Sequence, residues 1–111
     1  MPKASDDQSR FSDPGILILA SLSAGPKHGY AMMEDIAAFC GTRLEPGTLY
    51  GALARLERGG WVEPLEAEGR RRPYRLTVNG RTMLDAHLAT LERVVVAGRG
   101  SAHARRAHVP R

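Results

Sequence analysis

One short segment, bounded by a proline and a pair of glycines, constrains the fold of this chain more than any other. Residues 45–61 read EPGTLYGALARLERGGW. Pro46 suits the first position of a helix because its φ angle is already helical and the N–H that it lacks would have no partner there. Gly59 and Gly60 then stop the helix. The apolar residues recur at helical spacing and form one stripe, made of Leu49, Ala52, Leu53 and Leu56. The segment therefore predicts an amphipathic helix whose apolar face points into a core.

The opposite face of this helix carries small residues at its centre. They are Gly47, Gly51 and Ala54. Arg58 lies on the same face, and the residues that border it are Thr48, Tyr50 and Arg55. Glycine in a helix interior costs about 1 kcal/mol relative to alanine. Two glycines on an outer face therefore favour a surface that another molecule approaches closely. The alternative is a mediocre helix held together by packing alone.

A basic hairpin follows this helix. Two strands are predicted, at Trp61-Val62 and at Tyr74-Arg75-Leu76. A turn around Gly69 joins them, with the arginine triplet Arg70–Arg72 at its tip. A short helix followed by a basic hairpin is typical of winged helix-turn-helix proteins that bind DNA. For the triplet alone, the alternative is a solvated turn that Glu66 and Glu68 neutralise.

Three further helices are expected. The first starts at Asp13-Pro14 and ends at Gly25-Pro26, and its core candidates are Ile16, Leu17, Leu19 and Ala20. The second runs from about His28 to Cys40, stops at Gly41, and carries on one side Tyr30, Met33, Ala37 and Cys40. Thr77 is expected to cap the last helix.

The ordered motifs resemble the PadR family of bacterial transcriptional regulators. HGYAMMEDI (28–36) precedes LEPGTLYGALARLERGGWVE (44–63), and RRRPYRLTVNGRTML (70–84) follows it, so that the resemblance covers about residues 15–91. The sequence departs from the family at Pro73-Tyr74, where two aromatic residues are usual. Because proline cannot donate to a sheet ladder, Pro73 predicts an edge strand or a local irregularity. Glu45 is also less apt as a helix cap than Ser, Thr, Asp or Asn.

The helix at 46–58 is the expected DNA-recognition helix. Thr48 and Tyr50 are the candidates for contact with base edges or the nearby backbone. Gly47 and Gly51 would allow the close approach, and phosphate contacts are expected from Arg55 and Arg58.

Two further groups are expected to contact the DNA backbone. Lys27, His28 and Tyr30 surround the start of the second helix, where free N–H groups and the helix dipole favour a phosphate. The triplet Arg70, Arg71 and Arg72 is expected to enter a minor groove or follow its phosphates. For Tyr30 and Tyr50 the alternative is that both rings cap the core.

The last helix carries an apolar seam beyond the winged-helix motif. Its members step by four, three and four residues: Leu84, Leu88, Leu91 and Val95. The free energy gained by burying these side chains between two paired helices is far larger than that of a surface charge pair. We therefore expect a homodimer. The resemblance implies the same, with two recognition helices about 34 Å apart on a dyad-symmetric DNA site. The alternative is that the helix folds back on its own domain. The expected fold class is therefore mainly α with a small β-hairpin: a winged helix-turn-helix plus a C-terminal dimerisation helix.

No cofactor is expected, although the resemblance implies that a small aromatic effector binds between the subunits. The sequence supports a stacking site poorly, because Trp61 belongs to the hairpin and the last helix has no aromatic residue. A second regulatory hypothesis is titration of His87 beside the seam. Repression by operator occlusion is implied by the resemblance alone.

The charge of the chain is concentrated at one end. Residues 1–97 contain 12 basic and 12 acidic residues, so the net charge of +4 belongs to Arg99, Arg105, Arg106 and Arg111. We expect a disordered lead at 1–11, the winged helix-turn-helix with its dimerisation helix at 12–97, and a basic flexible tail at 98–111. The tail is expected to add weak, salt-sensitive DNA affinity.

Other features of the sequence narrow the class of protein. The single Cys40 excludes an internal disulfide, fits a reducing cytoplasm and is expected to pack rather than react. No convincing export signal is present, and no apolar run approaches the ~18 residues of a membrane span.

Four scattered histidines provide no catalytic set, and His103 with His108 forms only half of a metal site. The serious alternative is a winged helix that binds protein. A redox switch at Cys40 is the third hypothesis.

Overall fold

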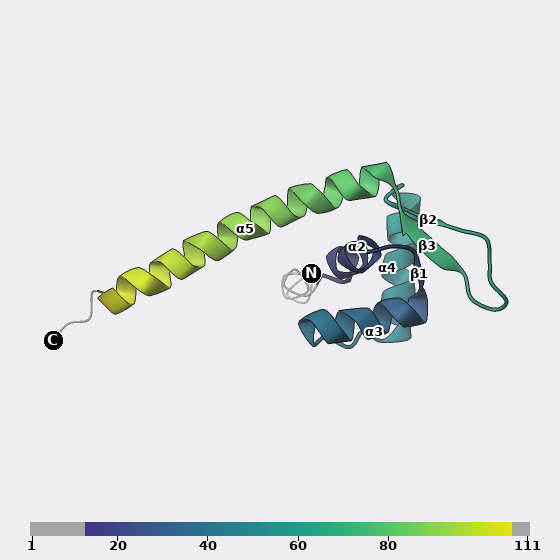
Figure 1. Ribbon diagram of the computed structural model, residues 1–111, viewed down its shortest axis with the longest axis horizontal. Coiled ribbons are helices and arrows are strands. Elements are labelled where there is room, and N and C mark those ends of the chain that lie inside the picture. The colour runs from purple at the N-terminus through teal and green to yellow at the C-terminus, as the bar shows by residue number, and fades with distance from the viewer. Residues whose placement is uncertain (1–12, 108–111) are drawn as a thin grey trace, which may run out of the picture.

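The computed structural model describes residues 13–107, and the side chains among them up to residue 100. The predicted lead at 1–11 and residues 108–111 lie outside this range. The elements are, in order, α2 (Pro14–Leu22), β1 (Lys27–His28), α3 (Gly29–Cys40), α4 (Pro46–Arg58), β2 (Val62–Pro64), β3 (Pro73–Leu76) and α5 (Val78–Ala107). Figure 1 shows α2, α3 and α4 gathered beside a small sheet, with the β2–β3 hairpin and α5 projecting in opposite directions. The expected fold class, mainly α with a winged hairpin, is confirmed.

Local sequence signals set the ends of the first three helices. The Asp13 side chain accepts a hydrogen bond from the backbone N–H of Gly15 at 2.9 Å, and Pro14 begins α2. Gly41 ends α3 in the left-handed conformation, with φ at 76°, and its N–H donates to the carbonyl of Ala37. Glu45 precedes α4 and makes no side-chain capping hydrogen bond, as expected for a residue less apt as a cap than Ser, Thr, Asp or Asn. Helix α4 therefore depends on Pro46 and on packing for its start.

The leucine stripe of α4 forms the centre of the core. Leu49, Ala52, Leu53 and Leu56 are all buried, as predicted. Helix α2 contributes Ile18, Leu19 and Leu22, whereas Ile16, Leu17 and Ala20 are only partly buried. The prediction for α2 was thus correct for Leu19 and missed Ile18 and Leu22, because this helix is apolar on nearly every side.

The buried face of α3 is not the side that carries Tyr30, Met33, Ala37 and Cys40. Met32 and Ile36 are fully buried, whereas Tyr30 and Cys40 are exposed. Both series recur at helical spacing, so the pattern alone does not decide which one faces α2 and α4. Cys40 therefore does not pack in the core.

The sheet has three antiparallel strands in the order β1-β3-β2. Pro73 pairs with His28, and Tyr74 lies between Lys27 and Pro64. The prediction that Pro73 marks an edge or an irregular strand was wrong, because the two-residue strand β1 places β3 at the centre. Pro73 is tolerated there as the first residue of β3, where its carbonyl accepts a hydrogen bond from Leu65 at 2.8 Å.

The start of α5 is fixed to the sheet. The Thr77 hydroxyl accepts from the N–H of Gly80 at 3.0 Å, which confirms the predicted cap. A Cβ atom at Gly80 would overlap the carbonyl oxygen of Trp61 and lie 2.9 Å from the side chain of Leu76. Only glycine allows α5 to leave the sheet at this distance.

Helix α5 is the longest element. It has 30 residues, or about 45 Å at the usual helical rise, and gives the molecule its longest extent of 65 Å. The helix continues past Ala97 to Ala107, so residues 98–107 are helical where the flexible tail was expected. Among the described residues, no helix combines the length and the apolar character that crossing a membrane requires.

Candidate nucleic-acid interface

The outer face of α4 is open. The predicted contact residues on it are all exposed: Gly47, Thr48, Tyr50, Gly51, Arg55 and Arg58. A Cβ atom at Gly47 would meet nothing within 4 Å, and one at Gly51 would meet only the Arg55 guanidinium at 3.8 Å. The fold of this chain therefore gives no steric reason for either glycine.

A shallow depression lies beside this face, between the start of α3, helix α4 and the wing, by which we mean the β2–β3 hairpin (residues 62–76). Its volume is about 200 Å³, and we call it the wing depression. It is lined by His28, Gly29, Tyr30, Tyr50, Arg70, Arg71, Arg72 and Tyr74. The fold thus brings together predicted contact residues from three separate segments. Gly29 and Tyr74 are members that were not predicted.

Gly29 sets the position of Tyr50. A Cβ atom at Gly29 would overlap the Tyr50 hydroxyl and lie 2.6 Å from Cζ of the ring. The ring of Tyr50 therefore lies against the first residue of α3, while about half of its surface remains exposed. Gly29 stands inside the HGY motif, but nothing in the sequence pairs it with a residue of the next helix.

Tyr74, which also lines the wing depression, stays protonated. Burial raises the pKa of its phenol above the ordinary value, and the Glu57 carboxylate raises it further, whereas Arg72 opposes the shift. The hydroxyl therefore remains a neutral hydrogen-bond donor at physiological pH.

Lys27, a predicted contact residue, does not line the wing depression. Its ammonium donates to the carbonyl of Ser21 at 2.6 Å and lies 3.8 Å from the Asp35 carboxylate. The Ser21 hydroxyl also donates to Asp35, at 2.7 Å. The Lys27 side chain is 20% exposed and joins the end of α2 to α3.

The three wing arginines have different surroundings. The guanidinium of Arg72 donates a hydrogen bond to the carbonyl of Leu65 at 2.7 Å and so links the two sides of the hairpin. Arg71 points toward His28, with Nη1 3.4 Å from Nε2. None of the ion pairs among the described residues joins the triplet to Glu66 or Glu68. The triplet therefore keeps its positive charge at the wing tip.

The predicted seam of α5 divides into two parts. Leu84 is 1% exposed and belongs to the core of its own domain, so it is not available to a second chain, contrary to the prediction. Leu88, Leu91 and Val95 are 40%, 45% and 48% exposed. Figure 1 shows this part of α5 extending away from the other helices. The alternative that the helix folds back on its domain therefore fits only its first turns.

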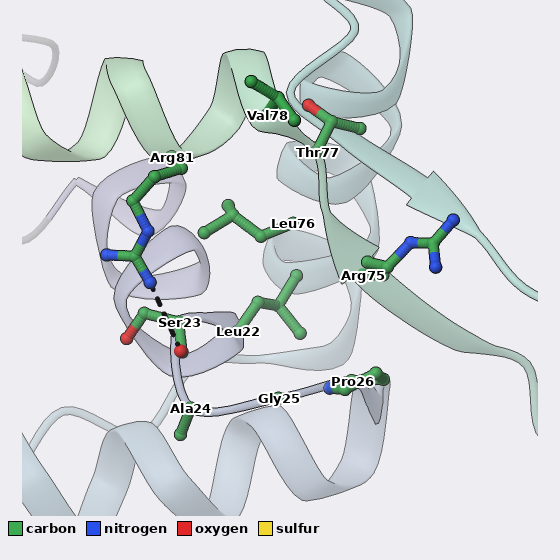
Figure 2. A pocket seen from close by; sticks show the side chains of 10 residues that line it. All are labelled: Leu22, Ser23, Ala24, Gly25, Pro26, Arg75, Leu76, Thr77, Val78 and Arg81. Carbon is green, nitrogen blue, oxygen red and sulfur yellow. Dashed lines mark hydrogen bonds between the residues drawn. The ribbon is translucent and has the colours of Figure 1, made fainter.

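A second hollow, of about 340 Å³, lies where α2, β3 and α5 meet. In Figure 2, Leu22 and Leu76 lie close together, Arg81 reaches toward Ser23, and Arg75 points away. A guanidinium N–H of Arg81 donates to the Ser23 carbonyl at 3.3 Å. None of the residues that line this α2–β3–α5 hollow is aromatic. Among the described residues, no three His, Cys, Asp or Glu side chains gather in a way that could hold a metal ion.

The architecture defines a winged helix-turn-helix protein. Helices α3 and α4 form the helix-turn-helix, and β2 and β3 form the wing beside it (Figure 1). Residues 18–86 match the Transcriptional regulator PadR-like family. The chain belongs to this family, whose members are transcriptional regulators rather than enzymes and for which membership implies DNA binding.

Relatives support this assignment at different levels. An uncharacterized 37.1 kDa protein in transposon Tn4556 of Streptomyces fradiae is 47% identical over 85 residues, which are 77% of this chain; the chain spans about a quarter of the length of that relative. A transcriptional regulator from Clostridium thermocellum is 26% identical with a TM-score of 0.72, covering 85% of this chain and 96% of its own. A PadR family regulator from Clostridium difficile matches the fold with a TM-score of 0.73 at 21% identity, over 80% and 97% of the two chains.

Proposed function

We propose that this protein is a dimeric transcriptional repressor that binds a dyad-symmetric DNA site and releases it in response to a small molecule. The observation that carries the proposal is the wing depression, where exposed tyrosines and arginines from α3, α4 and the wing meet beside the open face of α4. Aromatic and arginine side chains around a glycine-bearing helix suit a partner with both phosphates and flat base edges.

The contacts divide by chemistry. We assign base-edge or adjacent backbone contact to Thr48 and Tyr50, with Gly47 and Gly51 admitting the DNA surface. Arg55 and Arg58 on the same helix take phosphates. His28, Tyr30 and the wing arginines fix the register of the domain on the duplex. The Lys27 ammonium is engaged by the Ser21 carbonyl in the free protein.

The exposed part of the α5 seam supports a homodimer. Full burial of an aliphatic side chain is worth about 1.5–3 kcal/mol, and Leu88, Leu91 and Val95 are each nearly half exposed in one chain. Pairing α5 with a second α5 covers this surface and places two α4 helices on the two halves of one site. The separation for neighbouring major grooves on one DNA face is about 34 Å.

Repression follows from occupancy of DNA near a promoter, which excludes the polymerase. For the effector we propose the α2–β3–α5 hollow, because a ligand there would touch both the wing strand β3 and the start of α5. Its lining lacks aromatic residues, so the effector is small and does not depend on stacking.

The proposed location is the bacterial cytoplasm, with the protein on the nucleoid when bound. The proposed DNA-binding unit is 12–97, and the arginines of 98–111 add salt-sensitive affinity.

The test is the affinity of the full chain for the DNA upstream of its own gene, measured against a scrambled duplex at physiological salt. We expect a preference of about 10³-fold or more, in the range of specific binding. The matched control changes Arg99, Arg105, Arg106 and Arg111 to Gln, which removes the net charge. This variant should keep the preference and lose only affinity that both duplexes share. Equal, weak binding to both duplexes would contradict the proposal.

The second candidate is a winged helix that binds another protein. The neutrality of residues 1–97 favours it, because general DNA affinity depends on positive charge. Changing Arg70, Arg71 and Arg72 together to Gln separates the two candidates. A repressor loses DNA binding, whereas a protein-binding module keeps its partner.

A further inference from the structure

We propose that His28 and Arg71 act together as a two-donor site for one phosphate of the DNA backbone, with His28 in its neutral form. This inference rests on the proposed function, because the phosphate belongs to the bound duplex. It starts from one juxtaposition between α3 and the wing. Nη1 of Arg71 lies 3.4 Å from Nε2 of His28, although the two residues are 43 positions apart in the chain.

Both neighbours of the His28 ring are hydrogen-bond donors. The backbone N–H of Ala31 points at Nδ1 from 3.4 Å, so that His28 caps α3. The guanidinium of Arg71 has donors and no acceptor, and a neutral imidazole has one acceptor nitrogen. The ring can therefore accept from only one of its two neighbours. When Nδ1 caps the helix, Nε2 carries the hydrogen and faces another N–H.

An anionic oxygen can accept hydrogen bonds from both of these N–H groups. With the cap formed, two N–H donors, Nε2 of His28 and Nη1 of Arg71, lie 3.4 Å apart on the lining of the wing depression. One oxygen within about 2.9 Å of both nitrogens would accept both hydrogens. Charge-assisted hydrogen bonds of this kind are stronger than those between neutral groups. The site is thus incomplete in the free protein and is completed by an acceptor.

The surroundings favour a phosphate over a neutral acceptor. The residues that line the wing depression include three arginines and no carboxylate. The positive end of the α3 dipole lies at the same place and adds to the attraction for an anion. The open face of α4 is adjacent, so a duplex lying on α4 presents its backbone here. A phosphate held by both residues would join α3 to the wing.

Two substitutions of His28 separate its two nitrogens. His28→Asn keeps an acceptor near the position of Nδ1, and Asn is a good helix cap. It lacks a donor that reaches Arg71. His28→Gln keeps a donor near Nε2 and loses the cap. We expect His28→Asn to unfold at the temperature of the wild type and bind DNA about tenfold more weakly, and His28→Gln to unfold earlier and bind more tightly than His28→Asn.

The salt dependence reports the charge of each donor. The probe is the tightest-binding duplex selected from a random library by the full wild-type chain. Each cation that neutralises a phosphate contributes about −0.9 to the slope of log K against log salt. Arg71→Ala removes one such cation from each subunit of the dimer and should therefore make the slope shallower by about two units. His28→Asn should leave the slope unchanged, because a neutral donor releases no counterion, and a shallower slope for this variant would overturn the neutral form.

A scan of single methylphosphonates along the same duplex locates the contact. One position in each half-site should weaken wild-type binding about tenfold and have no further effect on the His28→Asn, Arg71→Ala double variant. Arg70→Ala is the matched control, and it should keep its sensitivity at that position. If His28→Asn binds as tightly as the wild type, the two-donor site is overturned. It is also overturned if the double variant keeps its sensitivity at every methylphosphonate position, since the two residues would then hold no phosphate of the duplex. If the wild type selects no sequence from the library, the proposed function fails and the two-donor site fails with it.

Discussion

The two ends of the molecule expose different kinds of surface. The wing end presents tyrosine rings, arginines and a bare helix face around the wing depression. The far half of α5 presents aliphatic side chains, among them Leu88, Leu91 and Val95. Polar and aromatic groups with unneutralised charge suit a nucleic acid, whereas an aliphatic stripe on a helix is best covered by another helix. The two surfaces therefore suit partners of different chemistry, as the proposed function requires.

The largest effect is expected from a charge placed in the aliphatic stripe of α5. Leu91→Asp would bury a carboxylate between two α5 helices, and we expect it to give a monomer by analytical ultracentrifugation. Because a monomer contacts only one half-site, affinity for a dyad-symmetric duplex should fall by 100-fold or more. Thr90→Asp, which is exposed beside the stripe, is the control and should remain dimeric. A dimeric Leu91→Asp protein would show that α5 is not the interface.

The next test concerns how the wing end is built. Gly29→Ala brings a Cβ atom into the Tyr50 ring, and overpacking of this kind costs about 1–3 kcal/mol of unfolding free energy. Tyr50 must move, so DNA affinity should fall as well. Adding Tyr50→Ala removes the clash. Urea denaturation of this double variant should show recovered stability, while gel-shift titration shows that DNA binding does not recover. If Gly29→Ala is as stable as the wild type, Tyr50 is not held against α3.

A third test separates stability from binding on α4 itself. Gly47→Ala has open space around the new methyl group and should stabilise the helix by up to about 1 kcal/mol. The same methyl group stands on the face that we assign to DNA, so affinity should fall. A variant that gains stability and keeps its full affinity would show that nothing approaches this face. Thermal unfolding and fluorescence anisotropy on one preparation measure both effects.

The extent to which the sequence predicts this molecule differs between its elements. Helix α4 follows from Pro46, the leucine stripe and the terminal glycines, because each signal is local and all agree. The buried face of α3 does not follow, since Tyr30 and Met33 recur at helical spacing as well as Met32 and Ile36 do. Packing against α2 and α4 decides between them.

The candidate site shows the same division between local and long-range signals. The exposed residues of α4 and the charge of the wing could be predicted, because they depend on one element each. The contact of Gly29 with Tyr50 and the inward turn of Lys27 could not, since each joins two elements at no regular spacing. Strand β1 was missed for a related reason. Two residues are too short for an alternating pattern, and Lys27–His28 is a strand only because β3 offers it an edge.

The smallest expected effects are those of removing Lys27 or Arg58, two side chains with the same charge but different surroundings. Lys27 donates to the carbonyl of Ser21 and lies near Asp35, whereas Arg58 is exposed at the end of α4. Lys27→Met should therefore lower the free energy of unfolding by about 1 kcal/mol and leave the salt slope of DNA binding unchanged. Arg58→Met should leave stability within about 0.5 kcal/mol and make that slope shallower by about two units, one from each subunit of the dimer. Denaturant titration and salt-dependent anisotropy measure the two quantities. If Lys27→Met changes the slope as much as Arg58→Met does, Lys27 reaches a phosphate in the complex, and the DNA-binding surface extends past the start of α3 toward the end of α2.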